Sequence, residues 1–218
     1  MNRRIISCMY KFIVVVFLTI GVTINVVNTV SVKALLSYFT MQSNIICLVA
    51  FIIFIILELI KKDYKNSDGY YIIKGAITIA ILVTGIVYNI GLSPMNFKMD
   101  FRTTTEISTL LVHVFSPILV FLDYLLFDKK GKFKLYYPAF WLVIPLNYII
   151  YVYLYSSKGG EFFGVGGSRQ FAYFFLDYNK IGYIGVMKWI SLFCFGILLL
   201  SYTLICIDYK MAKRVSKK

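Results

Sequence analysis

Long stretches without a charged side chain are the feature that most constrains this chain. They cover residues 12–32, 34–57, 75–97, 135–157 and 189–207, with a shorter one at 107–122. A helix needs about 20 consecutive apolar residues to cross the hydrocarbon core of a bilayer. The composition agrees, because 60% of the residues are hydrophobic and 15% are charged, against about 45–50% and about 25% in soluble domains.

The sequence therefore predicts an all-α fold, a polytopic membrane bundle of six transmembrane helices that forms a single integral membrane domain over residues 1–218. We expect the spans at about 12–31, 35–58, 73–93, 104–127, 136–155 and 186–207. The first span is longer than the apolar core of a secretory signal peptide, so we expect the chain to retain it.

The basic residues are unevenly divided between the two sides of this bundle. Sixteen fall on the side of the termini and seven on the other side. The positive-inside rule then predicts a protein of the cell membrane with both termini on the cytoplasmic side. The net charge of +13 sits at span ends, where it suits anionic lipid headgroups, and we expect no nucleic-acid partner. The sixteen are Arg3, Arg4, Lys11, Lys61, Lys62, Lys65, Lys74, Lys129, Lys130, Lys132, Lys134, Lys210, Lys213, Arg214, Lys217 and Lys218.

Metal and disulfide chemistry have no sequence pattern to support them. The four cysteines, Cys8, Cys47, Cys194 and Cys206, are scattered and form no CxxC pair. We therefore predict no metal site and no cofactor. The sequence leaves open whether the chain forms a homo-oligomer.

One predicted outer loop, at about 156–184, is much longer than the others. It contains six glycines and the aromatic run from Phe171 to Phe175. Aromatic side chains suit the membrane–water interface, so the loop is interpreted first as an interfacial anchor. The alternative is a lid over a pocket that opens outward, since long loops often have a function.

Polar side chains inside the predicted spans form the candidate site. Such groups are costly in lipid, so they mark either helix contacts or functional positions. In the predicted orientation Thr40, Asn44, Asn89 and the single histidine, His113, all fall in the outer half of the membrane. The candidate catalytic residues are Thr40 and His113, and the supporting residues are Ser43, Asn44, Asn89 and Glu106.

The chemistry of these residues leaves three interpretations open. A threonine hydroxyl becomes a nucleophile when an adjacent base takes its proton, and histidine suits that role near neutral pH. The supporting residues would orient the imidazole or stabilise an oxyanion. The second interpretation is a lipid-binding or proton-coupled transport protein using His113, Glu106 and Asp123. In the third, a structural subunit, the polar residues serve only as helix contacts.

Several short motifs resemble those of the bacterial six-span "Pr-six-Pr" membrane proteins, which are similar to the androgen-induced membrane proteins of animals. The resemblance covers nearly the whole chain. The motifs are Tyr38-Phe39-Thr40-x-x-Ser43-Asn44, His113-x-x-x-Pro117, Leu122-Asp123-Tyr124, Tyr137-Pro138, Trp141-Leu142-x-x-Pro145-Leu146-x-Tyr148 and Phe174-Phe175-Leu176-Asp177 with Gly182.

This resemblance implies a bacterial plasma-membrane protein and a reaction. The animal proteins are threonine hydrolases of fatty acid esters of hydroxy fatty acids. Their essential threonine matches Thr40, and their essential histidine matches His113. The resemblance therefore implies a lipid-ester hydrolase that acts on membrane lipids or fatty-acyl esters. We expect its pocket to lie between spans two, three and four and to open toward the outer leaflet.

Overall fold

The protein is an all-α bundle of six long apolar helical segments. The structure, a computed structural model, describes residues 3–60, 63–92, 104–164 and 167–215. Within these residues, six segments are long and apolar enough to cross a membrane, which confirms the predicted six-span fold. The segments are Arg3–Val27, Phe39–Ile60, Asp68–Gly91, Glu106–Phe127, Tyr137–Ser157 and Tyr178–Arg214.

Several spans combine shorter helical elements. Span three passes from an α-helix into a π-helix, span four contains a π-helical turn, and span five consists of two short helices. In chain order the helices and strands are α1 Arg3–Val27, α2 Val32–Leu36, α3 Phe39–Ile60, η1 Tyr64–Asn66, α4 Asp68–Ile86, η2 Val87–Leu92, α5 Thr104–Leu110, η3 Leu111–Phe115, α6 Ser116–Phe127, α7 Tyr137–Trp141, α8 Val143–Ser157, β1 Phe162–Gly164, β2 Gly167–Arg169, η4 Phe174–Leu176 and α9 Tyr178–Val215.

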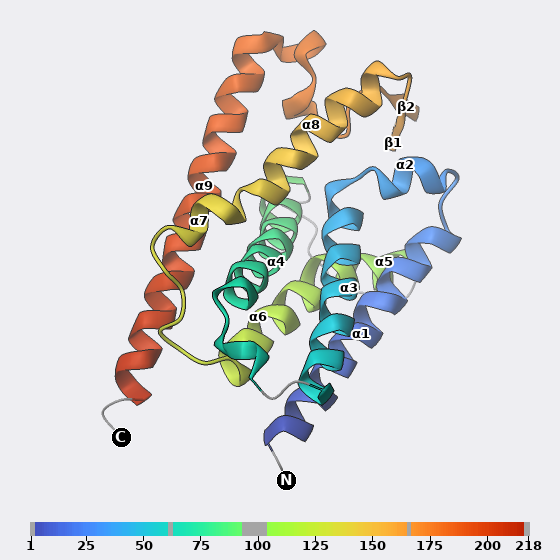
Figure 1. Ribbon diagram of the computed structural model, residues 1–218. Coiled ribbons are helices and arrows are strands. Elements are labelled where there is room, and N and C mark those ends of the chain that lie inside the picture. Colours follow the sequence, from blue (N-terminus) through green and yellow to red (C-terminus); the bar gives the residue numbers. More distant parts are fainter. Residues whose placement is uncertain (1–2, 61–62, 93–103, 165–166, 216–218) are drawn as a thin grey trace.

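Helix α1 begins and helix α9 ends at the same end of the bundle (Figure 1). The short helix α2 and the β1–β2 hairpin lie at the opposite end, where α3 begins and α8 ends. An even number of spans requires this arrangement. That the termini face the cytoplasm stays a prediction from the charge distribution.

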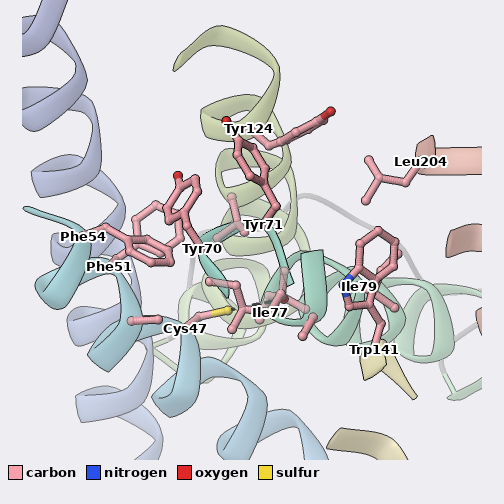
Figure 2. Packing of buried hydrophobic residues seen from close by; sticks show 14 of the residues in the cluster. Cys47, Phe51, Phe54, Tyr70, Tyr71, Ile77, Ile79, Tyr124, Trp141 and Leu204 are labelled. Atoms are coloured by element: carbon pink, nitrogen blue, oxygen red, sulfur yellow. Dashed lines mark hydrogen bonds between the residues drawn. The ribbon is translucent and has the colours of Figure 1, made fainter. Parts of the chain in front are cut away.

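Helix α4 forms the centre of the bundle. Of the residues in its apolar stretch, 67% are buried, against 22–44% in the other five spans. Aromatic side chains from α3, α4, α6 and α7 pack around it (Figure 2). Gly75 allows Trp141 to lie against α4, since a Cβ atom at this position would lie 2.2 Å from the indole ring. The core therefore depends on close approach of α7 to α4.

The structure corrects the predicted positions of two lysines. Lys11 and Lys74 were assigned to the loop ends of spans, but both lie inside helices and both are fully buried. Each contacts Asp123 of α6, and Lys11 Nζ lies 3.1 Å from its Oδ1 atom. A carboxylate from another helix neutralises both lysines, so they can lie buried inside a span. The charge-free stretches of the sequence did not predict this, because they were bounded at each lysine.

These three residues belong to a larger ion-pair network at the terminal end of the bundle. Lys65 Nζ lies 2.9 Å from Glu58 Oε2, and Lys74 Nζ lies 3.7 Å from Asp128 Oδ2. Three lysines thus face three carboxylates from α1, α3, α4, α6 and the adjoining loops. Without Lys11 and Lys74, the basic residues still number fourteen against seven, so the predicted orientation keeps its basis.

The long loop is folded. Helix α8 ends at Ser157, and α9 starts at Tyr178 but is interrupted at Gly182, whose backbone is not helical (φ 69°, ψ 165°). The loop therefore runs from residue 158 to this kink, close to its predicted end at about 184. It contains the β1–β2 hairpin and the 3-10 helix η4. Its aromatic residues Phe162, Phe171 and Phe175 are buried in a second apolar cluster with Tyr148 of α8. The loop therefore packs onto the bundle and does not only lie along its surface.

Candidate functional site

The side chains of Thr40 and His113 meet at the end of the bundle where α3 begins. Thr40 is the second residue of α3, and His113 lies in the π-helical turn η3 of span four. The Oγ1 atom of Thr40 lies 3.3 Å from Nε2 of His113. This is a slightly long hydrogen bond of the kind found in catalytic sites without substrate. The structure thus brings the two residues together, while their catalytic role stays a prediction.

The contacts of His113 indicate which ring nitrogen carries the proton. Its Nδ1 atom lies 3.1 Å from the carbonyl oxygen of Thr109. A carbonyl oxygen only accepts hydrogen bonds, so Nδ1 donates and is protonated in the neutral ring. The lone pair of Nε2 then faces Thr40, whose hydroxyl donates to it. This is the tautomer that a general base requires.

Tyr88 holds the plane of the imidazole. Its ring stacks on that of His113, with the centroids 3.7 Å apart and the planes at 21°. Tyr88 lies in the π-helix η2, and His113 lies in the π-helical turn η3. Such turns are rare and are frequent at functional sites. The histidine is therefore fixed at its edge by Thr109 and on its face by Tyr88.

Asn89 supports the main chain of His113. Its Nδ2 atom donates to the carbonyl oxygens of Gly85 at 2.7 Å and of His113 at 3.1 Å. Pro117 lies four residues after His113 and has no N–H, so it cannot donate to this carbonyl as an α-helical residue would. Asn89 supplies a donor in its place. Gly85 permits the approach, because a Cβ atom there would lie 3.0 Å from the same carbonyl oxygen.

Replacing Asn89 with leucine is expected to lower the free energy of unfolding by about 1–3 kcal/mol, because a buried carbonyl loses a donor. Thermal unfolding in detergent measures this change. Adding Pro117→Ala restores an N–H four residues after His113, so the double variant should regain part of the loss. Equal losses in the single and double variants would mean that Asn89 acts through another contact.

Ser43 and Asn44 hold the main chain around Thr40. Both donate to the Thr40 carbonyl oxygen, from Ser43 Oγ at 3.0 Å and from Asn44 Nδ2 at 2.8 Å. Asn44 also donates to the carbonyl oxygen of Val112 at 3.3 Å. The Oγ atom of Ser43 lies 2.7 Å from Oγ1 of Thr84. These bonds tie α3 to spans three and four, so both residues support Thr40 through its main chain.

Glu106 is the remaining predicted site residue. It is exposed and lies in the first turn of α5, two helical turns before His113. Both ring nitrogens of His113 already face Thr40 Oγ1 and the Thr109 carbonyl oxygen. A main-chain carbonyl therefore orients the imidazole, where the sequence suggested a carboxylate or an amide. Sequence analysis missed it because every residue carries a carbonyl.

Thr40 also lines an apolar cavity. The cavity is narrow, with a volume of about 80 Å³, which is below the range of about 300–1,000 Å³ for sites that enclose a small molecule. It lies between spans two, three, five and six and beneath η4, whereas we expected spans two, three and four. Tyr88 lines the cavity and stacks on His113, so span four lies behind that ring. The apolar lining includes Phe39, Leu146, Ile149, Ile190, Phe193 and Ile197.

Two aromatic residues at this site were missed by the sequence analysis. The available sequence signal for Tyr88 was its position directly before Asn89, which is a predicted site residue. Tyr173 lies in the aromatic run of the long loop, and its hydroxyl faces the side chains of Thr40 and Tyr148. It was assigned to the membrane interface, because the sequence does not distinguish a tyrosine at the interface from a buried one.

Comparison with protein-family models, with curated proteins and with solved structures gives no match for this chain. The functional argument therefore depends on the geometry of the site.

Proposed function

We propose that the protein is a membrane-embedded hydrolase of fatty-acyl esters, with Thr40 as the nucleophile and His113 as the general base. One observation carries this proposal: Oγ1 of Thr40, a residue that lines an apolar cavity, lies 3.3 Å from Nε2 of His113. A hydroxyl, a base and an apolar space beside them are the parts that cleavage of a fatty-acyl ester by covalent catalysis needs.

The proposed reaction has two stages. Oγ1 of Thr40 attacks the ester carbonyl carbon while Nε2 of His113 takes its proton. The tetrahedral intermediate collapses, the bond to the alcohol oxygen breaks, and His113 returns the proton to the departing alcohol. Water then attacks the acyl-threonine with His113 as base again, which releases the fatty acid and restores the hydroxyl.

The position of Thr40 on its helix supports this chemistry. It lies in the first turn of α3, a helix of 22 residues. The N-terminus of a helix carries partial positive charge from its main-chain N–H groups. Negative charge that develops on the carbonyl oxygen at this point is therefore stabilised by the helix.

The cavity wall supports entry of the substrate from the lipid. Leu146 of α8 lines the cavity and is 39% exposed on a transmembrane span. An acyl chain that enters sideways between helices never leaves an apolar medium, so it loses no hydrophobic stabilisation on the way in. The apolar lining and this route of entry support fatty-acyl esters held in the membrane as the substrate class.

The test is covalent labelling of the purified protein with a fluorophosphonate probe. We expect wild-type protein to be labelled and Thr40→Ala to be unlabelled. Thr203→Ala is the matched control, because Thr203 also lies in a transmembrane helix and donates to a main-chain carbonyl, at 2.8 Å. Wild-type protein that is not labelled, or labelling that survives in Thr40→Ala, would contradict the proposal.

The transport interpretation shares only His113 with this site. Asp123, its second predicted proton carrier, contacts Lys11 and Lys74. It lies ten residues after His113, which is about 15 Å along a helix axis. A liposome flux assay separates the two functions: pH-coupled uptake of a solute that is lost in His113→Ala would support transport.

A further inference from the structure

Tyr173 reaches the site from the loop that covers the cavity. It precedes η4 and has an extended backbone, with φ −135° and ψ 147°. Phe174, the next residue, is exposed, whereas Tyr173 lines the cavity. The hydroxyl of Tyr153 donates to the carbonyl oxygen of Leu176 at 2.9 Å and holds η4 against α8. The loop therefore presents the tyrosine to the cavity in a fixed position.

The ring of Tyr173 is held by aromatic neighbours. It stacks on Phe175, with the centroids 5.0 Å apart and the planes at 6°. It also packs edge-on against Tyr38, whose hydroxyl donates to the carbonyl oxygen of Phe163 in the hairpin. Its hydroxyl is thus set by the ring contacts, and it faces Thr40 and Tyr148.

The hydroxyl of Tyr173 keeps its proton throughout the neutral range. Burial raises the pKa of Tyr173 to about 12. The group is therefore available as a hydrogen-bond donor at the polar end of a cavity whose other walls are mostly apolar. In such surroundings a donor is worth more than in water, because little solvent competes for it.

We infer that Tyr173 is a catalytic residue that donates a hydrogen bond to the carbonyl oxygen of the bound ester. This inference rests on the proposed hydrolase function. When Thr40 attacks, the electron pair of the C=O bond moves to oxygen, and the hydroxyl of Tyr173 stabilises this oxyanion without giving up its proton. The pair returns when the alcohol leaves, so the tyrosine is unchanged at the end of each stage.

The same contact assigns an orientation to the substrate. The ester carbonyl lies between Thr40 and Tyr173, and the acyl chain extends along the apolar walls formed by α8 and α9, past Ile149 and Phe193. The loop that covers the cavity then also supplies the hydrogen-bond donor for the oxyanion. The loop thus has a chemical role as well as a role in covering the cavity.

The experiment compares Tyr173→Phe with wild-type protein in the hydrolysis of para-nitrophenyl palmitate in detergent micelles. We expect kcat to fall by about 100-fold, as when one oxyanion donor is removed, with KM nearly unchanged. Phenylalanine keeps the ring stacking on Phe175, so the loop should stay folded. The rate of fluorophosphonate labelling at Thr40 should fall as well, because the phosphoryl oxygen of the probe uses the same donor.

Two variants act as controls. Tyr151→Phe removes a hydroxyl of α8 that lies 2.7 Å from Ser37 Oγ and does not line the cavity, so kcat should be unchanged. Tyr153→Phe removes the hydrogen bond that holds η4 against α8. If Tyr173 had only a structural role in the loop, Tyr153→Phe and Tyr173→Phe would both raise KM to a similar extent.

The possible outcomes are distinct. An active wild type with unchanged kcat in Tyr173→Phe overturns the role of the tyrosine and leaves the proposed hydrolase intact. A wild-type protein that neither hydrolyses esters nor is labelled at Thr40 overturns the hydrolase proposal and the tyrosine with it. A loss of kcat confined to Tyr173→Phe supports the inference.

Discussion

Replacement of His113 with alanine is expected to lower kcat for ester hydrolysis by about 10²–10⁴-fold, the contribution of a positioned general base. KM should change little, because His113 does not line the cavity that would bind the acyl chain. Stopped-flow or plate-reader kinetics with para-nitrophenyl palmitate measure both constants in the same detergent.

The paired variant distinguishes a dyad from two independent residues. Thr40→Ala should lose at least as much activity as His113→Ala, and the double variant should be no slower than Thr40→Ala alone, because residues that act as a unit are not additive. Thr40→Ser keeps a hydroxyl and should retain part of the activity. Losses that multiply in the double variant would show that the two side chains do not work together.

The second large effect concerns stability. Asp123→Asn is expected to lower the free energy of unfolding by about 3–5 kcal/mol, the cost of removing one partner from a buried ion pair. Asp123 is fully buried and faces the ammonium groups of Lys11 and Lys74. The substitution keeps the shape of the side chain and leaves two buried cations without this carboxylate. Thermal unfolding in detergent, followed by circular dichroism, measures the loss.

A matched control is available on α4. Asp68 lies 2.5 Å from Lys134, and both side chains are about half exposed, so Asp68→Asn should shift the unfolding midpoint very little. Adding Lys74→Met to Asp123→Asn should recover part of the loss, since it removes a cation that has lost a partner. An unchanged midpoint in Asp123→Asn would contradict a stabilising role for the network.

Most of the fold could be predicted from the absence of charge in six stretches. Lys11 and Lys74 illustrate one cause of the remaining errors. A sequence count treats every lysine as a group that ends a span, but a lysine can lie inside a span when a carboxylate from another helix faces it. Asp123 lies more than a hundred residues after Lys11, so no local pattern joins them.

The candidate site was predictable in part. Thr40 and His113 stood out because polar residues in lipid are rare, and the structure brings them within 3.3 Å of each other. The residues that surround them were not predictable. Tyr88 and Tyr173 are ordinary tyrosines among the eighteen in the chain, and only their ring contacts distinguish them. The group that orients His113 is the main-chain carbonyl of Thr109, and a sequence does not show which carbonyl will contact a side chain.

The sequence by itself determined that this chain crosses a membrane six times, because the free energy of placing charge in lipid leaves few alternatives for such long apolar stretches. It also determined which polar residues had to find partners inside the bundle. Only the tertiary structure decided which partners those are. Hydrogen bonds and ion pairs between helices depend on rotations and crossings that differ by a few ångströms, and hydropathy does not record them. The tertiary structure alone also shows that the cavity lies beside spans five and six, with Tyr88 in its wall and His113 stacked on that ring.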